Sequence, residues 1–245
     1  MRLTTDALII RENNNIGESD RFVTALTREL GLVHASVRGA RNLKNRSASA
    51  TQLLCFSRLT LFQGREKYII DEAEPLEVFF ELRGDMEKLA LSQYFCELAG
   101  VLCPREEPAG DALRLLLNAL HFLAKGQRPP GLIKAVVELR LLSMAGYMPD
   151  LIACTGCGAG ESEPMWLSPR EATLRCAACA HPADAIALSA GVLAALRHIV
   201  YAPFEKCFSF SLPPERCAEL ADATERFALC QLGRGFNTLT FYHTL

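Results

Sequence analysis

Four cysteines in two closely spaced pairs are the residues whose spacing most directly predicts chemistry. Cys154-Thr-Gly-Cys157 and Cys176-Ala-Ala-Cys179 are two CxxC motifs with 18 residues between them. Each motif lets two thiolates converge on one ion, and four thiolates complete a closed tetrahedral shell. Because sulfur fills every position, such a shell has no open place for a catalytic water. The sequence therefore predicts one structural Zn²⁺ per chain, bound by Cys154, Cys157, Cys176 and Cys179.

Two alternatives to this ligand set stay open. His181 could replace Cys179 as the fourth ligand, and the motifs could be unrelated thiol pairs or a thioredoxin-like redox motif, although no βαβ pattern flanks them. No secretory signal precedes the ten cysteines, which favours a reducing cytosol over a disulfide framework. The six remaining cysteines fall mostly in apolar patterns and are predicted to be buried: Cys55, Cys96, Cys103, Cys207, Cys217 and Cys230.

A second candidate site is the stretch 30–65, which contains no Asp or Glu although the chain has 28. Its centre, residues 38–46, interleaves basic residues with Gly and Asn, as expected of a flexible loop that contacts successive phosphates. A solvated surface loop is the alternative. The predicted DNA-binding residues are Arg38, Arg41, Lys44 and Arg46, with Arg21 and Arg65 as further candidates.

The charge of the chain is distributed unevenly. Residues 1–65 carry 10 basic and 5 acidic groups, whereas residues 66–245 carry 16 basic and 23 acidic groups. This asymmetry indicates a basic N-terminal module joined to an acidic remainder. No apolar run reaches the length of a membrane span, so we expect a cytoplasmic protein with no membrane partner.

The elements that must position these residues change in type near residue 75. Five short β segments are predicted at 4–12, 21–28, 31–38, 52–62 and 67–72, which fits a small closed barrel such as an OB-fold. Helical spacing of apolar residues follows, with one helix beginning at Pro129-Pro130 and ending near Gly146. The strand aromatics Phe22, Phe56, Phe62 and Tyr68 are interpreted as core residues and not as base-stacking platforms.

An ordered set of short segments resembles the RecO family of bacterial recombination mediators over essentially the whole chain. No single segment is specific, but the order is. The segments are ALIIR (7–11), GESDR (17–21), TRELG (27–31), RGAR (38–41), GR (64–65), AE (73–74), LRGD (82–85), ELRLL (138–142), GYMP (146–149) and CTGCG (154–158).

The resemblance implies an α+β protein: an N-terminal OB-fold β-barrel at 1–78 that binds DNA, then an all-α C-terminal domain at 79–245. The helical domain would carry a zinc-ribbon-like insertion at about 150–185. The implied function is DNA repair in the RecF pathway, by binding single- and double-stranded DNA and annealing complementary strands. The implied partners are RecR, the C-terminal tail of single-stranded DNA-binding protein and, indirectly, RecA, at the bacterial nucleoid.

Arg140 is the first candidate for binding that tail, because a guanidinium beside an apolar helical stripe could pair with a chain-terminal carboxylate. A snorkelling surface arginine or a structural ion pair with Glu138 is the alternative. Lys125, Arg128 and Lys134 could add positive potential nearby.

The sequence gives little support for an enzyme. It contains no GxxxxGK[ST] loop, no HExxH helix and no GxSxG elbow, and no histidine is followed by a glutamate two residues later. We therefore predict a non-catalytic mediator. A zinc-dependent nucleic-acid-modifying enzyme and a protein-binding scaffold are the alternatives.

Overall fold

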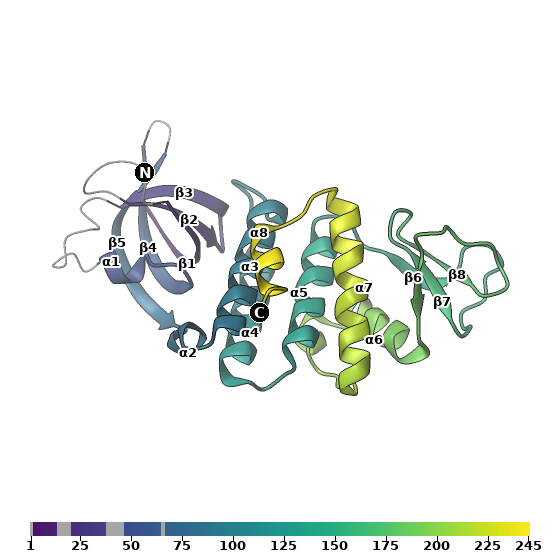
Figure 1. Cartoon of the computed structure of the whole chain (residues 1–245). Coiled ribbons are helices and arrows are strands. Elements are labelled where there is room, and N and C mark those ends of the chain that lie inside the picture. The colour runs from purple at the N-terminus through teal and green to yellow at the C-terminus, as the bar shows by residue number, and fades with distance from the viewer. Residues whose placement is uncertain (1, 14–20, 38–46, 65–66) are drawn as a thin grey trace. The chain divides into compact units, whose positions relative to one another are not determined.

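The computed structural model describes residues 2–13, 21–37, 47–64 and 67–245 (Figure 1). It divides into two compact units, one formed by Met1–Lys125 with Phe236–Leu245 and the other by Gly126–Gly235. The helices are shared between these units. The predicted domain boundary between residues 78 and 79 therefore stays a prediction.

A closed five-stranded barrel begins the first unit, as predicted. Its strands are β1 (Arg2–Asn13), β2 (Arg21–Thr27), β3 (Gly31–Val37), β4 (Cys55–Gln63) and β5 (Tyr68–Val78). They close in the order β1-β2-β3-β5-β4, in which only the β3–β5 pair is parallel. A short helix, α1 (Ser47–Ala50), lies between β3 and β4. The predicted turn at 13–17 lies mostly outside the described residues.

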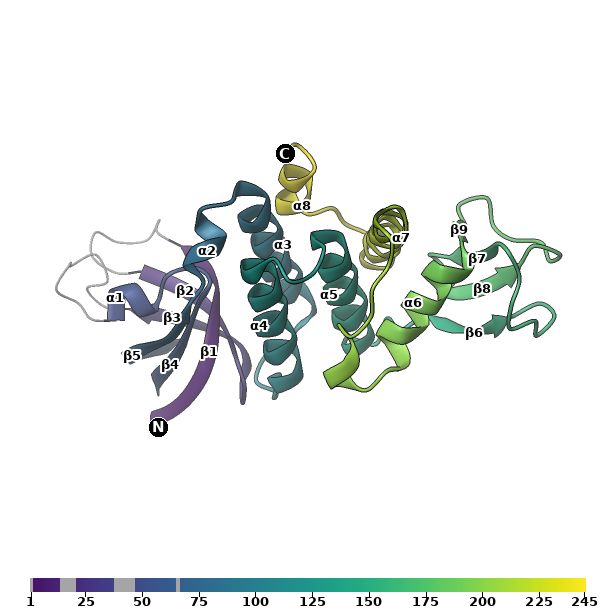
Figure 2. The same cartoon turned by 90° about the horizontal axis from the view of Figure 1, so that it is seen from below.

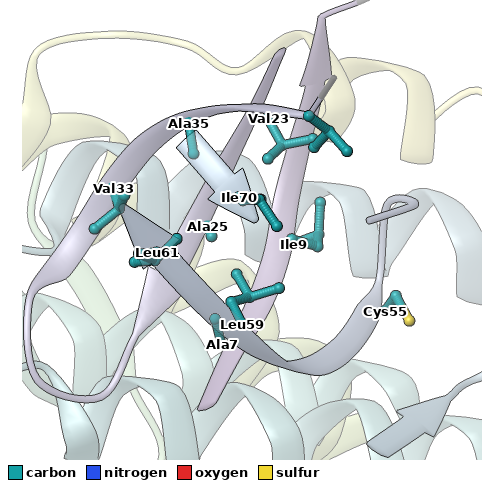
Figure 3. Packing of buried hydrophobic residues seen from close by; sticks show 11 residues of the cluster. Ala7, Ile9, Val23, Ala25, Val33, Ala35, Cys55, Leu59, Leu61 and Ile70 are labelled. Carbon is teal, nitrogen blue, oxygen red and sulfur yellow. The ribbon is translucent and has the colours of Figure 1, made fainter. Parts of the chain in front are cut away.

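The barrel core is made of small and branched aliphatic side chains (Figure 3). Inward positions alternate along each strand, as Ala7 and Ile9 do in β1 and Val23 and Ala25 do in β2. On the outer face of the barrel, Leu8 of β1 pairs with Leu26 of β2, which pairs with Leu32 of β3, and this outer row is also buried. Helix α3 (Met86–Leu102) contacts β1, and α4 (Gly110–Lys125) contacts β1 and β2, so this part of the barrel has helices against its outer face (Figure 2).

The β2–β3 hairpin is bonded to the segment between α3 and α4. The Leu32 amide donates to Pro104 O at 2.8 Å, and the Glu106 amide donates to Leu30 O at 2.9 Å. Gly31 has a φ of +59°, and a Cβ there would lie only 2.2 Å from Pro104 O. Glycine is required because a side chain would both strain the backbone and push the two segments apart.

Two short helices complete the first unit. Helix α2 (Phe80–Arg83) joins the barrel to α3, and α8 (Asn237–Tyr242) returns to pack on α3. Glu97 of α3 accepts a hydrogen bond from the Thr238 amide at 3.2 Å, and the rings of Tyr94 and Phe236 meet edge to face with centroids 5.5 Å apart. The last residues of the chain therefore belong to the same unit as the barrel.

The second unit combines three helices with a small sheet. Helix α5 (Pro130–Met144) has the predicted bounds, and it packs on α7 (Pro214–Leu232) and α6 (Ala190–Tyr201). A short 3₁₀ helix, η1 (Phe204–Lys206), follows α6. Strands β6 (Asp150–Cys154), β7 (Met165–Ser168), β8 (Thr173–Cys176) and β9 (Ile186–Leu188) form the sheet, in the order β6-β8-β7-β9. This sheet occupies the position of the predicted zinc-ribbon-like insertion.

Candidate metal centre and nucleic-acid surface

The four predicted cysteine ligands form one cluster. Cys154 ends β6 and Cys176 ends β8, and these neighbouring parallel strands bring the two CxxC turns together. All four Sγ atoms lie within 4.8 Å of one another. Cys157 Sγ is 3.5 Å from Cys176 Sγ, far beyond the roughly 2.05 Å of a disulfide. Four free thiols converging from two turns could hold a single metal ion, as predicted.

Backbone hydrogen bonds favour the thiolate form of Cys154, whereas the neighbouring cysteines oppose ionisation of Cys179. Hydrogen bonds from the backbone, that of Cys176 first, lower the pKa of Cys154 to about 6. Hydrogen bonds with the other cysteines, Cys176 first, raise the pKa of Cys179 to about 12. Four adjacent thiolates repel one another unless a cation lies between them. A divalent metal would reverse this balance, because a coordinating thiol is deprotonated outright.

His181 lies outside the cluster, which removes the alternative in which it replaces Cys179. Its ring stacks on that of Trp166, with centroids 4.0 Å apart and planes inclined by 11°. Its Nδ1 lies 3.3 Å from Pro182 O. The side chains that could hold a metal ion here are therefore the four cysteines.

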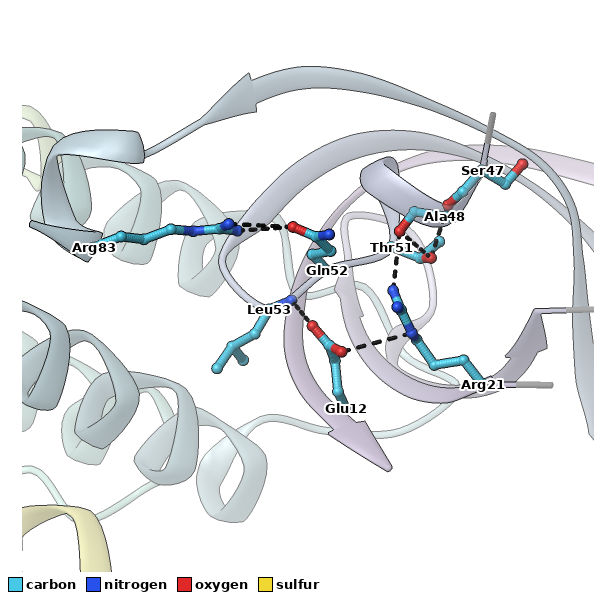
Figure 4. Close-up of polar contacts among 8 residues, drawn as sticks. All are labelled: Glu12, Arg21, Ser47, Ala48, Thr51, Gln52, Leu53 and Arg83. Atoms are coloured by element: carbon cyan, nitrogen blue, oxygen red, sulfur yellow. Dashed lines mark hydrogen bonds and ion pairs between the residues drawn. The ribbon is translucent and has the colours of Figure 1, made fainter. Parts of the chain in front are cut away.

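Arg21 connects β2 to the short helix that follows the basic loop (Figure 4). Its guanidinium donates to Ala48 O at 2.9 Å and lies 3.6 Å from a carboxylate oxygen of Glu12. Glu12 in turn accepts a hydrogen bond from the Leu53 amide. The side chain of Arg21 is only 15% exposed. Arg21 therefore links β2 to α1, and its predicted phosphate contact stays a prediction.

The other predicted DNA-binding residues, Arg38, Arg41, Lys44, Arg46 and Arg65, lie outside the described residues. Their role stays a prediction. The described residues on either side of this segment are the end of β3 at Val37 and the start of α1 at Ser47. The acid-free segment therefore lies in the chain between a barrel strand and the short helix α1.

Three of the four strand aromatics lie outside the barrel core, so the core interpretation was wrong for them. Phe22, Phe56 and Phe62 alternate with inward residues along β2 and β4, and Phe62 is 45% exposed. Only Tyr68 packs against the core cluster. Lys67 Nζ lies 5.1 Å from the centroid of the Phe22 ring.

Lys134 is a buried structural residue, which corrects its prediction as a tail-binding cation. Its ammonium has three acceptors: Glu225 Oε2 at 2.8 Å, Glu138 Oε1 at 2.9 Å and Ala221 O at 3.1 Å. Since an ammonium has three N–H groups, no donor remains for a ligand. Burial lowers the pKa of Lys134, but attraction to the two glutamates outweighs burial and raises it overall.

The remaining predicted tail cations differ in their surroundings. Lys125 forms an exposed ion pair with Glu81 at 2.6 Å, and Arg128 is half-buried. Arg140 is half-buried on α5 and donates from Nη2 to Ala202 O at the end of α6. Exposed apolar side chains follow Arg140 in the chain or precede Ala202, which Arg140 contacts: Met144, Tyr147, Met148, Ile152 and Tyr201. Tyr201 is tied to the start of the sheet, because the Leu151 amide donates to its hydroxyl at 3.0 Å.

Comparison with known proteins assigns the chain to a family. Residues 1–79 match the family model "Recombination protein O N terminal", and residues 83–240 match "Recombination protein O C terminal". The chain belongs to the RecO family. The DNA repair protein RecO of Acetivibrio thermocellus is 32% identical over 99% of this chain and 97% of its own length. That of Symbiobacterium thermophilum is 33% identical over 98% and 96%.

The RecO family is one of DNA repair mediators and not of catalytic enzymes, which agrees with the prediction from the sequence. The barrel, the helical region after it and the four-cysteine cluster fit the α+β organisation that the resemblance implied. Among the described residues, no helix has the length and apolar character needed to cross a membrane.

Proposed function

We propose that this RecO family member is a recombination mediator of the RecF pathway. It binds single- and double-stranded DNA, anneals complementary strands and, with RecR, helps to load RecA onto DNA coated by single-stranded DNA-binding protein. The observation that supports the proposal is the acid-free basic segment 38–46, which lies in the chain between strand β3 of an OB-fold barrel and helix α1. Cancelling phosphate charge on two complementary strands lowers their repulsion and so favours annealing.

Replacing Arg38, Arg41, Lys44 and Arg46 together by Ala is expected to weaken DNA binding and flatten its salt dependence. Each lost phosphate contact reduces the slope of log K against log salt by about 0.7 for a single strand, so four contacts reduce it by roughly 3. Fluorescence anisotropy with a labelled oligonucleotide at several salt concentrations measures this slope, and a strand-annealing assay run alongside tests the activity.

The matched control removes four exposed cations that the structure places in ion pairs with acids: Arg2, Arg58, Lys125 and Arg216. Both quadruple variants change the net charge equally, so only the location of the charge differs. An unchanged slope in the loop variant would refute the assigned surface. A protein that binds its partners but no DNA would instead favour the scaffold alternative.

We propose that the cysteine cluster holds one structural Zn²⁺. Zinc is the ion that four cysteine ligands in two CxxC turns most often bind, and it would supply cross-linking of the two turns and not catalysis. The four ligands come from the turns at the ends of β6 and β8, so the ion would tie these two turns together. A metal-dependent enzyme is disfavoured because four sulfur ligands leave no coordination position for substrate or water.

We propose that Arg140 and the exposed apolar residues beside it bind the tail of single-stranded DNA-binding protein. Replacing Arg140 by Ala is expected to weaken an acidic peptide with a C-terminal Phe by about tenfold or more, since hydrogen bonds to charged groups contribute about 1.5–3 kcal/mol. DNA binding should change little. Isothermal titration calorimetry with the peptide and anisotropy with DNA measure the two affinities.

Two controls separate tail recognition from the structural contact of Arg140 with Ala202 O. The same peptide with a C-terminal amide lacks the carboxylate charge and should bind the wild-type protein as weakly as the acid peptide binds the variant. Arg216→Ala removes an exposed arginine paired with Glu219 in the same unit and should leave peptide binding intact. Equal losses for peptide and DNA would mean that Arg140 serves the fold and not the tail.

A further inference from the structure

A row of cationic and polar side chains crosses the outer face of three barrel strands, and sequence reasoning missed it. The strand register places Arg11 of β1 opposite Thr24 of β2, and Thr24 opposite His34 of β3. Thr24 Oγ1 lies 3.0 Å from His34 Nδ1. Arg105 joins the row from the segment after α3, through a bridge between Gly31 and Arg105. Arg11, His34 and Arg105 are all exposed.

This row lies next to the buried outer row Leu8–Leu26–Leu32, two residues away along the same face of β2. A β-bulge at Ile10 shifts the β1 register, so that Ile9 pairs with Ala25 while Arg11 pairs with Thr24. Ile10 is buried, and Arg11 emerges at the surface directly after it. Bulges re-aim side chains in this way, and here the bulge places a cation at the edge of the helix-covered area.

The next register step carries an aromatic side chain. Phe22 pairs with Asn13 on one side and Ser36 on the other, two residues from Thr24 on the same outer face. Its ring is half-buried and has the Lys67 ammonium 5.1 Å from its centroid. Cations beside an outward aromatic ring are the combination that single-stranded nucleic acid uses, through phosphate contacts and base stacking.

The cations of the row are close enough for their charges to act on His34. Burial first, then the charges of Arg105 and Arg11, lower the pKa of His34. The carboxylates Glu106 and Glu107 follow Arg105 in the same segment, but no carboxylate is among the causes that act on His34. No salt bridge in the described part of the chain uses Arg11 or Arg105.

From this arrangement we propose that Arg11, His34 and Arg105, with Phe22 beside them, form a second nucleic-acid site on the strand face, which takes the phosphates of a single strand. The inference rests on the proposed function and extends it, because none of these residues belongs to the 38–46 segment. A protein with two such surfaces can hold two strands at once. Thr24 orients His34 toward the phosphate and supplies no charge.

The test compares two double variants in binding an oligothymidine of about 16 nucleotides. Arg11→Gln with Arg105→Gln is expected to reduce the salt slope by roughly 1.4, the value for two lost contacts to a single strand. Arg2→Gln with Arg58→Gln removes two barrel cations that already pair with Asp71 and Asp6, and should leave the slope unchanged.

A second measurement uses the wild-type protein and needs no variant that might alter folding. A bound phosphate favours the charged imidazolium, so NMR titration should show a higher pKa for His34 with oligothymidine than without it. Its resonance is assigned by its loss in His34→Gln. If DNA binds while the His34 pKa and the Arg11/Arg105 slope stay unchanged, the second site is overturned and the loop assignment stands. If the wild-type protein binds no DNA, the proposed function fails as well.

Discussion

Replacement of Cys176 by Ser is expected to release the metal ion and unfold the β6–β9 sheet. The proposed ion would join two turns of a small sheet, and the binding free energy of structural zinc, about 10–16 kcal/mol in zinc-finger peptides, is folding free energy. Metal analysis should find one zinc per wild-type chain and none in the variant. Trp166, the single tryptophan of the chain, lies on β7 and reports the sheet by its fluorescence.

The matched control is Cys230→Ser, which removes a half-buried thiol outside the cluster and should keep the metal. DNA binding through the barrel should survive in both variants, because the barrel belongs to the other compact unit. A wild-type protein that contains no metal, yet melts at the same temperature after chelator treatment, would refute a structural zinc.

Features with local sequence signals were predicted well. The two CxxC turns, the five barrel strands and the bounds of α5 each follow from spacing within a few residues, such as the prolines before α5 and the glycine after it. The four-cysteine cluster could be predicted because a CxxC turn places its own two thiols, whatever the rest of the fold does.

The face of β2 that points into the barrel could not be predicted from the sequence in this way. Phe22, Thr24 and Leu26 alternate with Val23, Ala25 and Thr27, and both sets contain apolar residues. The reason is that helices cover the outer row at Leu26, so both faces of the strand are partly buried. The direction of Phe22 and the exposed row next to it could be assigned only after the register and the covering helices were known.

Lys134 shows a different limit of the sequence. Glu138 lies one helical turn along α5 and was visible as a neighbour, but Glu225 and Ala221 come from α7, about 90 positions away in the chain. A lysine near the start of a helix is usually solvated, and only the packing of α5 on α7 buries this one. Because of this packing, we expect substitution of Lys134 to lower the stability of the second unit.

Replacement of Lys134 by Met is expected to destabilise the second unit by about 3–5 kcal/mol, because it leaves the fully buried carboxylate of Glu138 without its cation. Thr224 Oγ1 would still donate to Glu138 Oε2, at 2.7 Å, but a hydroxyl carries no compensating charge. Urea unfolding followed by helical circular dichroism measures the loss. The stabilisation from the charged Lys134 should be constant at neutral pH. Because its pKa is raised in the folded protein, this stabilisation is lost only as the pH rises above the pKa of an unfolded lysine, about 10.4.

Two further variants distinguish burial of the charge from loss of the lysine itself. Lys125→Met breaks the exposed pair with Glu81 and should cost less than about 1 kcal/mol, because water solvates the remaining carboxylate. Lys134→Met combined with Glu138→Leu removes the stranded buried charge and should recover much of the stability lost in the single variant. Glu138→Leu alone completes the comparison. If the loss of stability in the double variant equals the sum of the losses in Lys134→Met and Glu138→Leu, the cost comes from packing, and the ion pair does not hold α5 on α7.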